Sequence, residues 1–227
     1  MLDLIKVIVT LVILVKASLD DLRTREISNK IWIIMILIAL ILNVIQYAIH
    51  KFDVLSAIIQ FLVVFAIANA MYYLFGFGGA DCKALICLAV MFPIYPKIFD
   101  FTVPGQIFTL SVLVDSAIPI VFLVLMNFVR NAIKGNFGLL MFLGYRVKIG
   151  KIPRFHNLLE YVKNGRVVHS LRGVEPNDKI LDDLRRIGIE YVWITPVLPF
   201  ITFITFGFVL AVILGDLMII LIRLYFC

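Results

Sequence analysis

The chain is poor in charge and in cysteine. Asp, Glu, Lys and Arg make up only 16% of its 227 residues, whereas soluble domains hold about a quarter. Apolar residues reach 63%, and the mean hydropathy is +1.06. This composition excludes an ordinary soluble enzyme and a disordered chain. It indicates a membrane protein that crosses the bilayer several times.

The three cysteines are Cys82, Cys87 and Cys227. They are too few for a disulfide framework and lack the paired spacing of a zinc site. We predict no metal site and no bound cofactor. The net charge of +6 could indicate a nucleic-acid partner. In a membrane protein it more often reflects cytoplasmic loops and anionic lipid. We therefore expect anionic membrane lipid as a partner, and no nucleic acid.

Hydrophobic runs of about 20 residues can cross a bilayer as helices. Six such runs, the fourth of them short, lie at about 2–19, 31–49, 54–75, 84–96, 106–129 and 196–222. The first begins without a clear basic segment and is longer than the apolar core of a typical signal peptide, so we interpret it as a retained helix. The predicted fold class is mainly α: a polytopic membrane helix bundle of six transmembrane helices with a small cytoplasmic α+β insert before the last helix.

This division predicts three parts. Residues 1–129 form the membrane domain with the first five helices, 130–195 form the soluble insert, and 196–227 complete the membrane domain with the sixth helix. Within the insert, residues 145–149, 166–169 and 191–195 alternate as strands do. Asn177 can cap a helix that runs to about Ile187.

The distribution of Lys and Arg predicts the orientation. Alternation of six spans places 17 of the 21 basic residues on one face, which we assign to the cytoplasm. The other face carries only Lys6, Lys51, Lys97 and Arg223. The N-terminus and Cys227 are then expected outside, and the insert inside.

Carboxylates within or beside a membrane are costly, so each is a candidate for function. Asp21 at the end of the first span and Asp81 at the start of the fourth are expected at the same cytoplasmic level. Asp115 and Asp216 fall nearer the outer ends of their spans, where they can meet each other but not the first pair. The alternative for Asp115 and Asp216 is a buried polar contact between helices, for example with Asn127 or Ser116.

Two facing carboxylates at a dry site share one proton, because both cannot ionise cheaply. The ionised member can take a proton from water while the protonated member polarises a carbonyl, which is aspartic-protease chemistry. Gly78 and Gly79 beside Asp81 are expected to adopt backbone angles closed to other residues and to let a substrate strand approach. The alternative is that these glycines only pack the turn between two helices.

Two segments resemble the aspartate motifs of prepilin peptidases. Residues 21–29 (DLRTREISN) are similar to the first motif, an Asp followed after five residues by Ile-Pro-Asn, with Ser28 in place of the proline. Residues 78–83 (GGADCK) are similar to the second motif, Gly-x-Gly-Asp-x-Lys, with Ala80 in place of the second glycine. The six-span plan and the insert before the last span resemble archaeal preflagellin peptidases within the type IV prepilin peptidase family of GxGD-type membrane aspartyl proteases.

The resemblance implies an aspartic endopeptidase that removes a short basic leader from preflagellin or prepilin-like precursors at the cytoplasmic membrane face. Asp21 and Asp81 would be its catalytic residues, with Gly78, Gly79 and Lys83 as supporting residues. Asp20 and Glu26 lie near the first motif and could attract the leader. Bacterial relatives that also N-methylate their product often carry a loop with paired cysteines, which this chain lacks, so we predict no methyltransferase activity.

Two other functions remain open from the residues alone. An ion or solute transporter could use Asp115 and Asp216 as coupling sites, although transporters place such groups at mid-depth in broken helices. A non-catalytic scaffold of a filament export apparatus would make all the carboxylates structural. Residues 130–195 carry twelve basic and six acidic residues, so the insert should repel a basic leader and favour anionic headgroups.

Overall fold

The structure is a computed structural model that describes residues 1–50 and 52–226. The outer positions predicted for Lys51 and Cys227 lie outside these residues. The chain forms two compact units. The first comprises Met1–Pro119 together with the chain from Pro199 onward, and the second comprises Ile120–Leu198.

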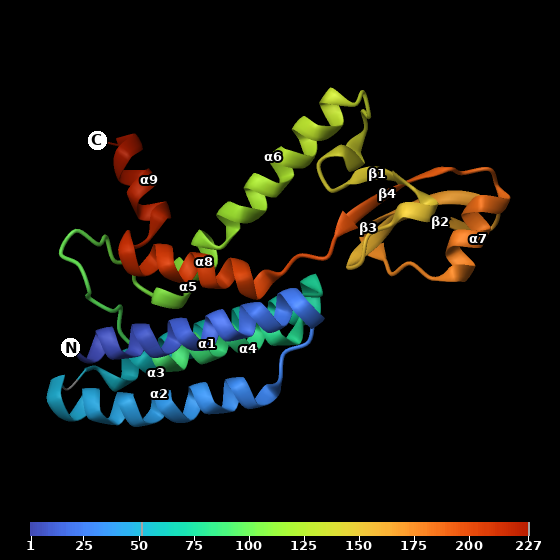
Figure 1. Ribbon diagram of the computed structural model, residues 1–227. Coiled ribbons are helices and arrows are strands. Elements are labelled where there is room, and N and C mark those ends of the chain that lie inside the picture. Colours follow the sequence, from blue (N-terminus) through green and yellow to red (C-terminus); the bar gives the residue numbers. More distant parts are fainter. Residues whose placement is uncertain (51, 227) are drawn as a thin grey trace. The chain divides into compact units, whose positions relative to one another are not determined.

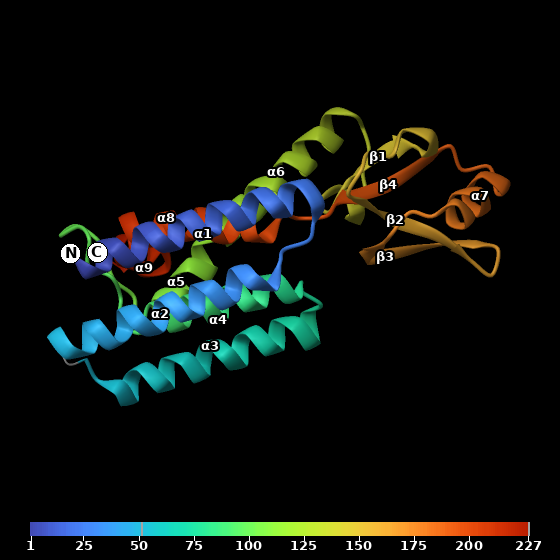
Figure 2. The ribbon, with the colours of Figure 1, turned by 60° about the horizontal axis from the view of Figure 1, so that its bottom comes forward.

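The first unit is built from helices (Figure 1). They are α1 (Leu2–Thr24), α2 (Asn29–His50), α3 (Val54–Phe75), α4 (Gly79–Met91), α5 (Phe108–Asp115), α8 (Phe200–Ile213) and α9 (Leu217–Phe226). The helices α1 to α4 run side by side, as Figures 1 and 2 both show. α1 packs against α8, α2 and α3 pack against α4, and α5 packs against α8. This packing brings the end of α1 and the beginnings of α4 and α8 into one bundle.

Three helical stretches are long and apolar enough to cross a membrane: Asn29–Ile49, Val54–Phe75 and Phe108–Ile133. They overlap the predicted spans at 31–49, 54–75 and 106–129. Between 17% and 22% of their most apolar windows is buried inside the protein, so most of their apolar side chains face outward. Such a surface suits lipid rather than water, and it confirms the membrane class.

Three predicted spans differ from the helices observed. The fourth helix begins earlier than expected and ends at Met91. The fifth span is interrupted at Ser116, between α5 and α6 (Ala117–Ile133). The prediction of one continuous helix over 196–222 is wrong, because the chain breaks between α8 and α9. There Gly215 has φ 95°, and the Asp216 amide donates to the Val103 carbonyl at 2.8 Å. The backbone at the break is therefore hydrogen-bonded to a distant loop.

The second unit joins most of α6 to a four-stranded antiparallel sheet of order β1-β4-β2-β3. Its elements are η1 (Leu139–Met141), β1 (Tyr145–Lys148), η2 (Ile149–Lys151), β2 (His156–Lys163), β3 (Arg166–Val174), α7 (Asp178–Arg186) and β4 (Tyr191–Pro196). Leu158, Leu184 and Ile194 lie in its buried core. The three predicted strands and the helix capped by Asn177 are confirmed, whereas β2 was not predicted.

Candidate active site

Asp21 lies in the last turn of α1, close to the point where the helix ends. Arg25 ends the helix in the left-handed conformation, with φ 59°, and donates its N–H to the Asp21 carbonyl at 3.1 Å. The same residue places its Nη1 atom 3.7 Å from Asp21 Oδ1. The backbone of Ile201, at the start of α8, lies close enough to this carboxylate to lower its pKa. Asp21 is 9% exposed, so it is held by two elements in a largely buried position.

Asp81 lies in the first turn of α4. The Gly78 N–H donates to Asp81 Oδ2 at 3.2 Å and fixes the carboxylate against the turn. A Cβ atom on Gly78 would come within 2.9 Å of that oxygen. The residue must therefore be small, because any side chain would displace the carboxylate.

The prediction of unusual backbone angles at Gly78 and Gly79 is wrong. Gly78 has ordinary extended angles, φ −63° and ψ 141°, and Gly79 is the first residue of α4. The left-handed position is Gly76, with φ 72°, which ends α3. The chain reverses direction where α3 ends, so the left-handed backbone conformation occurs at Gly76 and not at the glycines beside Asp81.

The two carboxylates interact electrostatically. Both lie outside the predicted spans 2–19 and 84–96 and outside the three long apolar stretches. Burial raises the pKa of Asp81, and the nearby charge of Asp21 raises it further. Burial also raises the pKa of Asp21, but the guanidinium of Arg25 opposes that rise. The pair therefore retains one proton more readily than separate carboxylates would, and Asp81 is the member on which this proton is held more strongly.

Lys83 connects the two motif segments. Its Nζ atom donates to Asn29 Oδ1 at 2.7 Å, and Asn29 begins α2 at the end of the first motif. The prediction of the site did not include Asn29, Arg25 or the backbone of Ile201. Arg25 had a usable signal, because residues i and i+4 are neighbours on a helix. Ile201 had none, since it lies 180 residues beyond Asp21.

The remaining predicted site residues occupy separate surroundings. Asp20 forms an ion pair with Lys16 on the same helix, and Glu26 is exposed in the link that follows α1. Asp115 is fully buried and interacts electrostatically with Asp216. This agrees with the prediction that the two residues can meet near the outer ends of their spans.

The polar contact suggested between Asp115 and Ser116 is not formed. Ser116 Oγ donates instead to the Leu113 carbonyl at 2.6 Å, because that acceptor lies one helical turn back. Ser111 Oγ donates to Asp216 Oδ2 at 2.7 Å and joins α5 to the start of α9.

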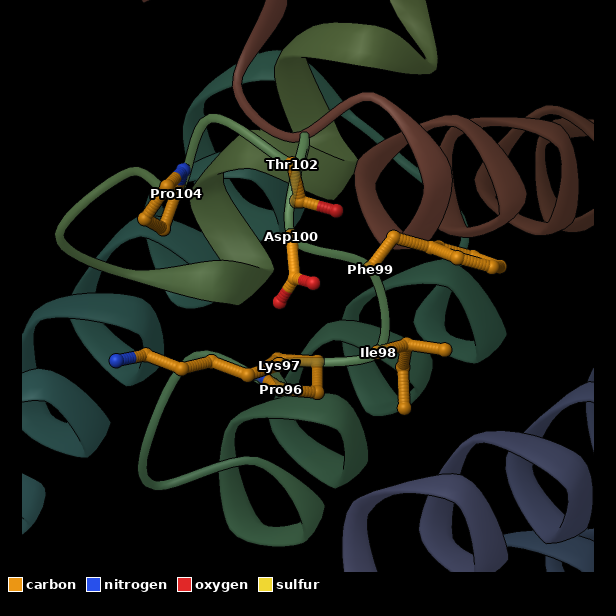
Figure 3. Close-up of a pocket in the computed structure, with 7 residues that line it drawn as sticks. All are labelled: Pro96, Lys97, Ile98, Phe99, Asp100, Thr102 and Pro104. Atoms are coloured by element: carbon orange, nitrogen blue, oxygen red, sulfur yellow. The ribbon is translucent and has the colours of Figure 1, made fainter.

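The first unit contains one cavity beside the second motif and another in a loop far from it. A cavity of ≈ 210 Å³ between α3 and α4 is lined in part by Tyr72, Gly79, Cys82 and Lys83, so it adjoins the second motif. Another, of ≈ 320 Å³, is formed by the loop from Pro96 to Pro104 (Figure 3). The amide of Lys97 in this loop donates to Asp3 Oδ2 at 3.3 Å. This cavity therefore lies near Asp3, roughly 27 Å along α1 from Asp21 at 1.5 Å per residue.

No group of three or more His, Cys, Asp or Glu residues is placed to hold a metal ion within residues 1–50 and 52–226. Cys82 and Cys87 are buried free thiols. At the level of the two motifs, the described ionisable groups include the carboxylates Asp21 and Asp81 and the cation Arg25.

The sequence matches two family models. The Type IV leader peptidase family matches residues 8–130, and the Archaeal Peptidase A24 C-terminus Type II matches residues 138–217. The first match covers more than half of the chain and includes both aspartate motifs. The chain therefore belongs to the type IV leader peptidase family, and the resemblance drawn from its motifs is confirmed.

Known relatives agree with this assignment over nearly the whole chain. A preflagellin peptidase of Methanocaldococcus jannaschii is 28% identical over 94% of this chain and 95% of its own length. A preflagellin peptidase of Methanococcus voltae is 28% identical over 88% of this chain and 91% of its own length. One of Methanococcus maripaludis is 26% identical over 89% of this chain and 92% of its own length. The function is that of a protease that processes leader peptides, and the transporter and scaffold alternatives are not favoured.

Proposed function

We propose that this chain is an aspartic endopeptidase in which Asp21 and Asp81 form the catalytic pair. The observation that carries the proposal is the electrostatic interaction between these two carboxylates, which come from the end of α1 and the start of α4. The relatives named preflagellin peptidase support the substrate class. The substrate is a preflagellin or prepilin-like precursor, from which the enzyme removes a short basic leader.

The surroundings of the pair suggest different starting roles. Arg25 favours an ionised Asp21, whereas burial and the neighbouring charge favour a protonated Asp81. Asp21 takes a proton from water as the water oxygen attacks the scissile carbonyl carbon, and Asp81 gives its proton to the carbonyl oxygen. When the tetrahedral intermediate collapses, the C–N bond breaks and Asp21 passes its proton to the leaving nitrogen. Asp81 recovers a proton from the hydroxyl group, which restores the pair.

The supporting residues hold this pair in place. Gly78 fixes Asp81 through its N–H, and Gly79 opens α4 beside the cavity next to the motif. Lys83 ties α4 to the start of α2 through Asn29. Asp20 and Glu26 are proposed to attract the basic leader, because both lie within five residues of Asp21.

The proposed topology has six transmembrane spans in residues 1–129 and 196–227, with the N-terminus outside. The catalytic pair and the insert, residues 130–195, lie on the cytoplasmic side. The insert carries a net charge of +6, from twelve basic and six acidic residues, which favours contact with anionic lipid. No methyltransferase activity is proposed, since the sequence has no loop with paired cysteines.

Cleavage of a tagged preflagellin by membranes that contain Asp21→Asn or Asp81→Asn protein tests the catalytic pair. Each change keeps the shape of the side chain but removes an acid–base group, so the cleavage rate should fall by at least roughly 100-fold. Asp100→Asn is the matched control, because Asp100 is exposed in the loop at the other end of α1. Wild-type rates in both pair variants, at equal expression, would refute the aspartic mechanism.

A further inference from the structure

The sheet of the second unit is fastened to the last turns of α6. Asn131 is fully buried, and its Nδ2 atom donates to the carbonyls of Met141 at 2.9 Å and Gly144 at 2.7 Å. One turn earlier, the ring of Phe128 stacks on that of Phe142, with centroids 5.4 Å apart and planes 9° apart. The segment that leads into β1 is therefore held beside the end of α6.

The end of α6 also indicates how deep in the membrane this segment lies. α6 is the second half of the apolar stretch Phe108–Ile133. Arg130 is the first cation along this stretch, and Lys134 follows its end. Phe128 precedes Arg130 by two residues, about 3 Å of helix rise. Apolar residues directly before the first cations lie where a span leaves the hydrocarbon. Phe142, stacked on Phe128, must lie at that same level.

The segment Phe137–Leu143, here called the interface loop, exposes apolar side chains at this level. Phe137 is 74% exposed and Leu139 is 75% exposed, and Phe142 is exposed as well. Phe137 and Leu139 also line a cavity of ≈ 270 Å³ together with Leu171 of β3, which is itself exposed. A soluble surface rarely gathers so many large apolar groups.

We propose that the interface loop lies in the interfacial layer of the membrane, with Phe137 and Leu139 among the upper acyl chains. Lys134 then reaches the phosphate groups, as cations at the end of a span do, while the guanidinium of Arg130 lies 3.8 Å over the ring of Tyr145. The occupant of this apolar surface is membrane lipid, because the stacking on Phe128 places the loop beside the end of a membrane helix. The depth comes from α6 alone. The choice of the cytoplasmic leaflet rests on the proposed function.

Nitroxide labels at Phe137→Cys and Leu139→Cys test the proposal in the full-length chain. The three native cysteines are replaced by Ala, and the protein is reconstituted in vesicles of phosphatidylglycerol and phosphatidylcholine. Ile187→Cys is the matched control, because Ile187 is also apolar and 41% exposed. It follows α7, which lies at the opposite end of the sheet from α6 in Figures 1 and 2.

The measurement compares collisions of each label with oxygen, which enters lipid, and with a water-soluble nickel chelate. The ratio of oxygen to nickel collisions at positions 137 and 139 should exceed the ratio at 187 roughly tenfold, because a polar chelate is excluded from the apolar layer. Equal ratios at all three positions would overturn the proposal. Shielding of 137 and 139 only after a precursor is added would also overturn it, since the surface would then receive substrate.

The same vesicles separate this proposal from the proposed function. Each labelled protein is assayed for leader cleavage alongside the collision measurement. Lipid access at 137 and 139 in a protein that does not cleave supports the interface loop and counts against the protease. Cleavage without lipid access overturns the interface loop and leaves the catalytic pair in place.

Discussion

At the scale of single residues, the two carboxylates have unlike neighbours. Asp21 is 3.7 Å from the guanidinium of Arg25, whereas Asp81 accepts the neutral amide of Gly78. A cation stabilises an ionised carboxylate more strongly than an amide does. The asymmetry lets one member begin as base and the other as acid, although both are aspartates.

Arg25→Gln should change the pH dependence of cleavage. Arg25 lowers the pKa of Asp21, so removing its charge raises that pKa. Asp21 would then lose its charge at a higher pH, and the acidic limb of the cleavage profile should move up by about 1 pH unit. Arg25→Lys should restore part of the shift. The control is Arg23→Gln, an exposed arginine in the same turn, and an identical profile for both Gln variants would contradict the role of Arg25.

Gly78→Ala should impair cleavage while leaving the fold intact. The new Cβ would lie 2.9 Å from Asp81 Oδ2, and the backbone angles of Gly78 suit alanine, so the carboxylate moves rather than the helix. We expect a loss of roughly tenfold or more in the cleavage rate, because general acid–base catalysis needs placement within hydrogen-bond reach.

The matched control is Gly150→Ala, because a Cβ there would meet nothing within 4 Å. Thermal unfolding in detergent should be nearly unchanged for both variants. Equal cleavage by the two would show that the Gly78 contact does not position Asp81.

At the scale of helices and strands, local sequence signals were enough to predict an element whose two ends are both set by nearby residues. The predicted span 54–75 coincides with α3. Asp53 caps its start by accepting from the amides of Leu55 and Ser56, and Gly76 ends it in a left-handed conformation. These are short-range effects that composition and turn residues carry.

Prediction failed where distant contacts decide the backbone. The break between α8 and α9 depends on Val103, which pairs with Gly215 across the chain, so the apolar run 196–222 carries little sign of it. β2 was missed because its central residues, Leu158, Leu159 and Glu160, are all buried. A strand covered on both faces loses the alternation by which strands are found.

The contact between α5 and α8 gives a prediction about stability. A Cβ on Gly207 would lie 2.4 Å from the Val112 carbonyl oxygen and 2.6 Å from the Ser116 nitrogen. Both are backbone atoms, so Gly207→Ala should lower the free energy of unfolding by about 1–3 kcal/mol. Thermal unfolding in detergent measures this, with Gly150→Ala as control, because a Cβ there meets nothing within 4 Å. An unchanged melting temperature for Gly207→Ala would mean that the helices are not so close.

At the scale of the whole molecule, the orientation can be tested by labelling from each side. Asp100→Cys and Lys163→Cys, in a chain without its native cysteines, place thiols at exposed positions in the loop after α4 and at the end of β2. The charge distribution predicts the first outside and the second inside. A membrane-impermeant maleimide applied to intact cells should label Asp100→Cys alone, and both after lysis. Labelling of Lys163→Cys in intact cells would reverse the topology.

The beginning of α8 completes the environment of Asp21. The backbone of Ile201 lies near the carboxylate and lowers its pKa. Phe200 packs edge-on against Phe77 of the turn before α4, and Ser18 of α1 hydrogen-bonds to Thr205 at 2.8 Å. These contacts come from residues that follow both aspartates in the chain. A nascent chain that already holds both aspartates therefore lacks the α8 part of this environment until α8 has been made. We therefore expect a chain truncated before α8 to leave Asp21 without these neighbours and to cleave no precursor.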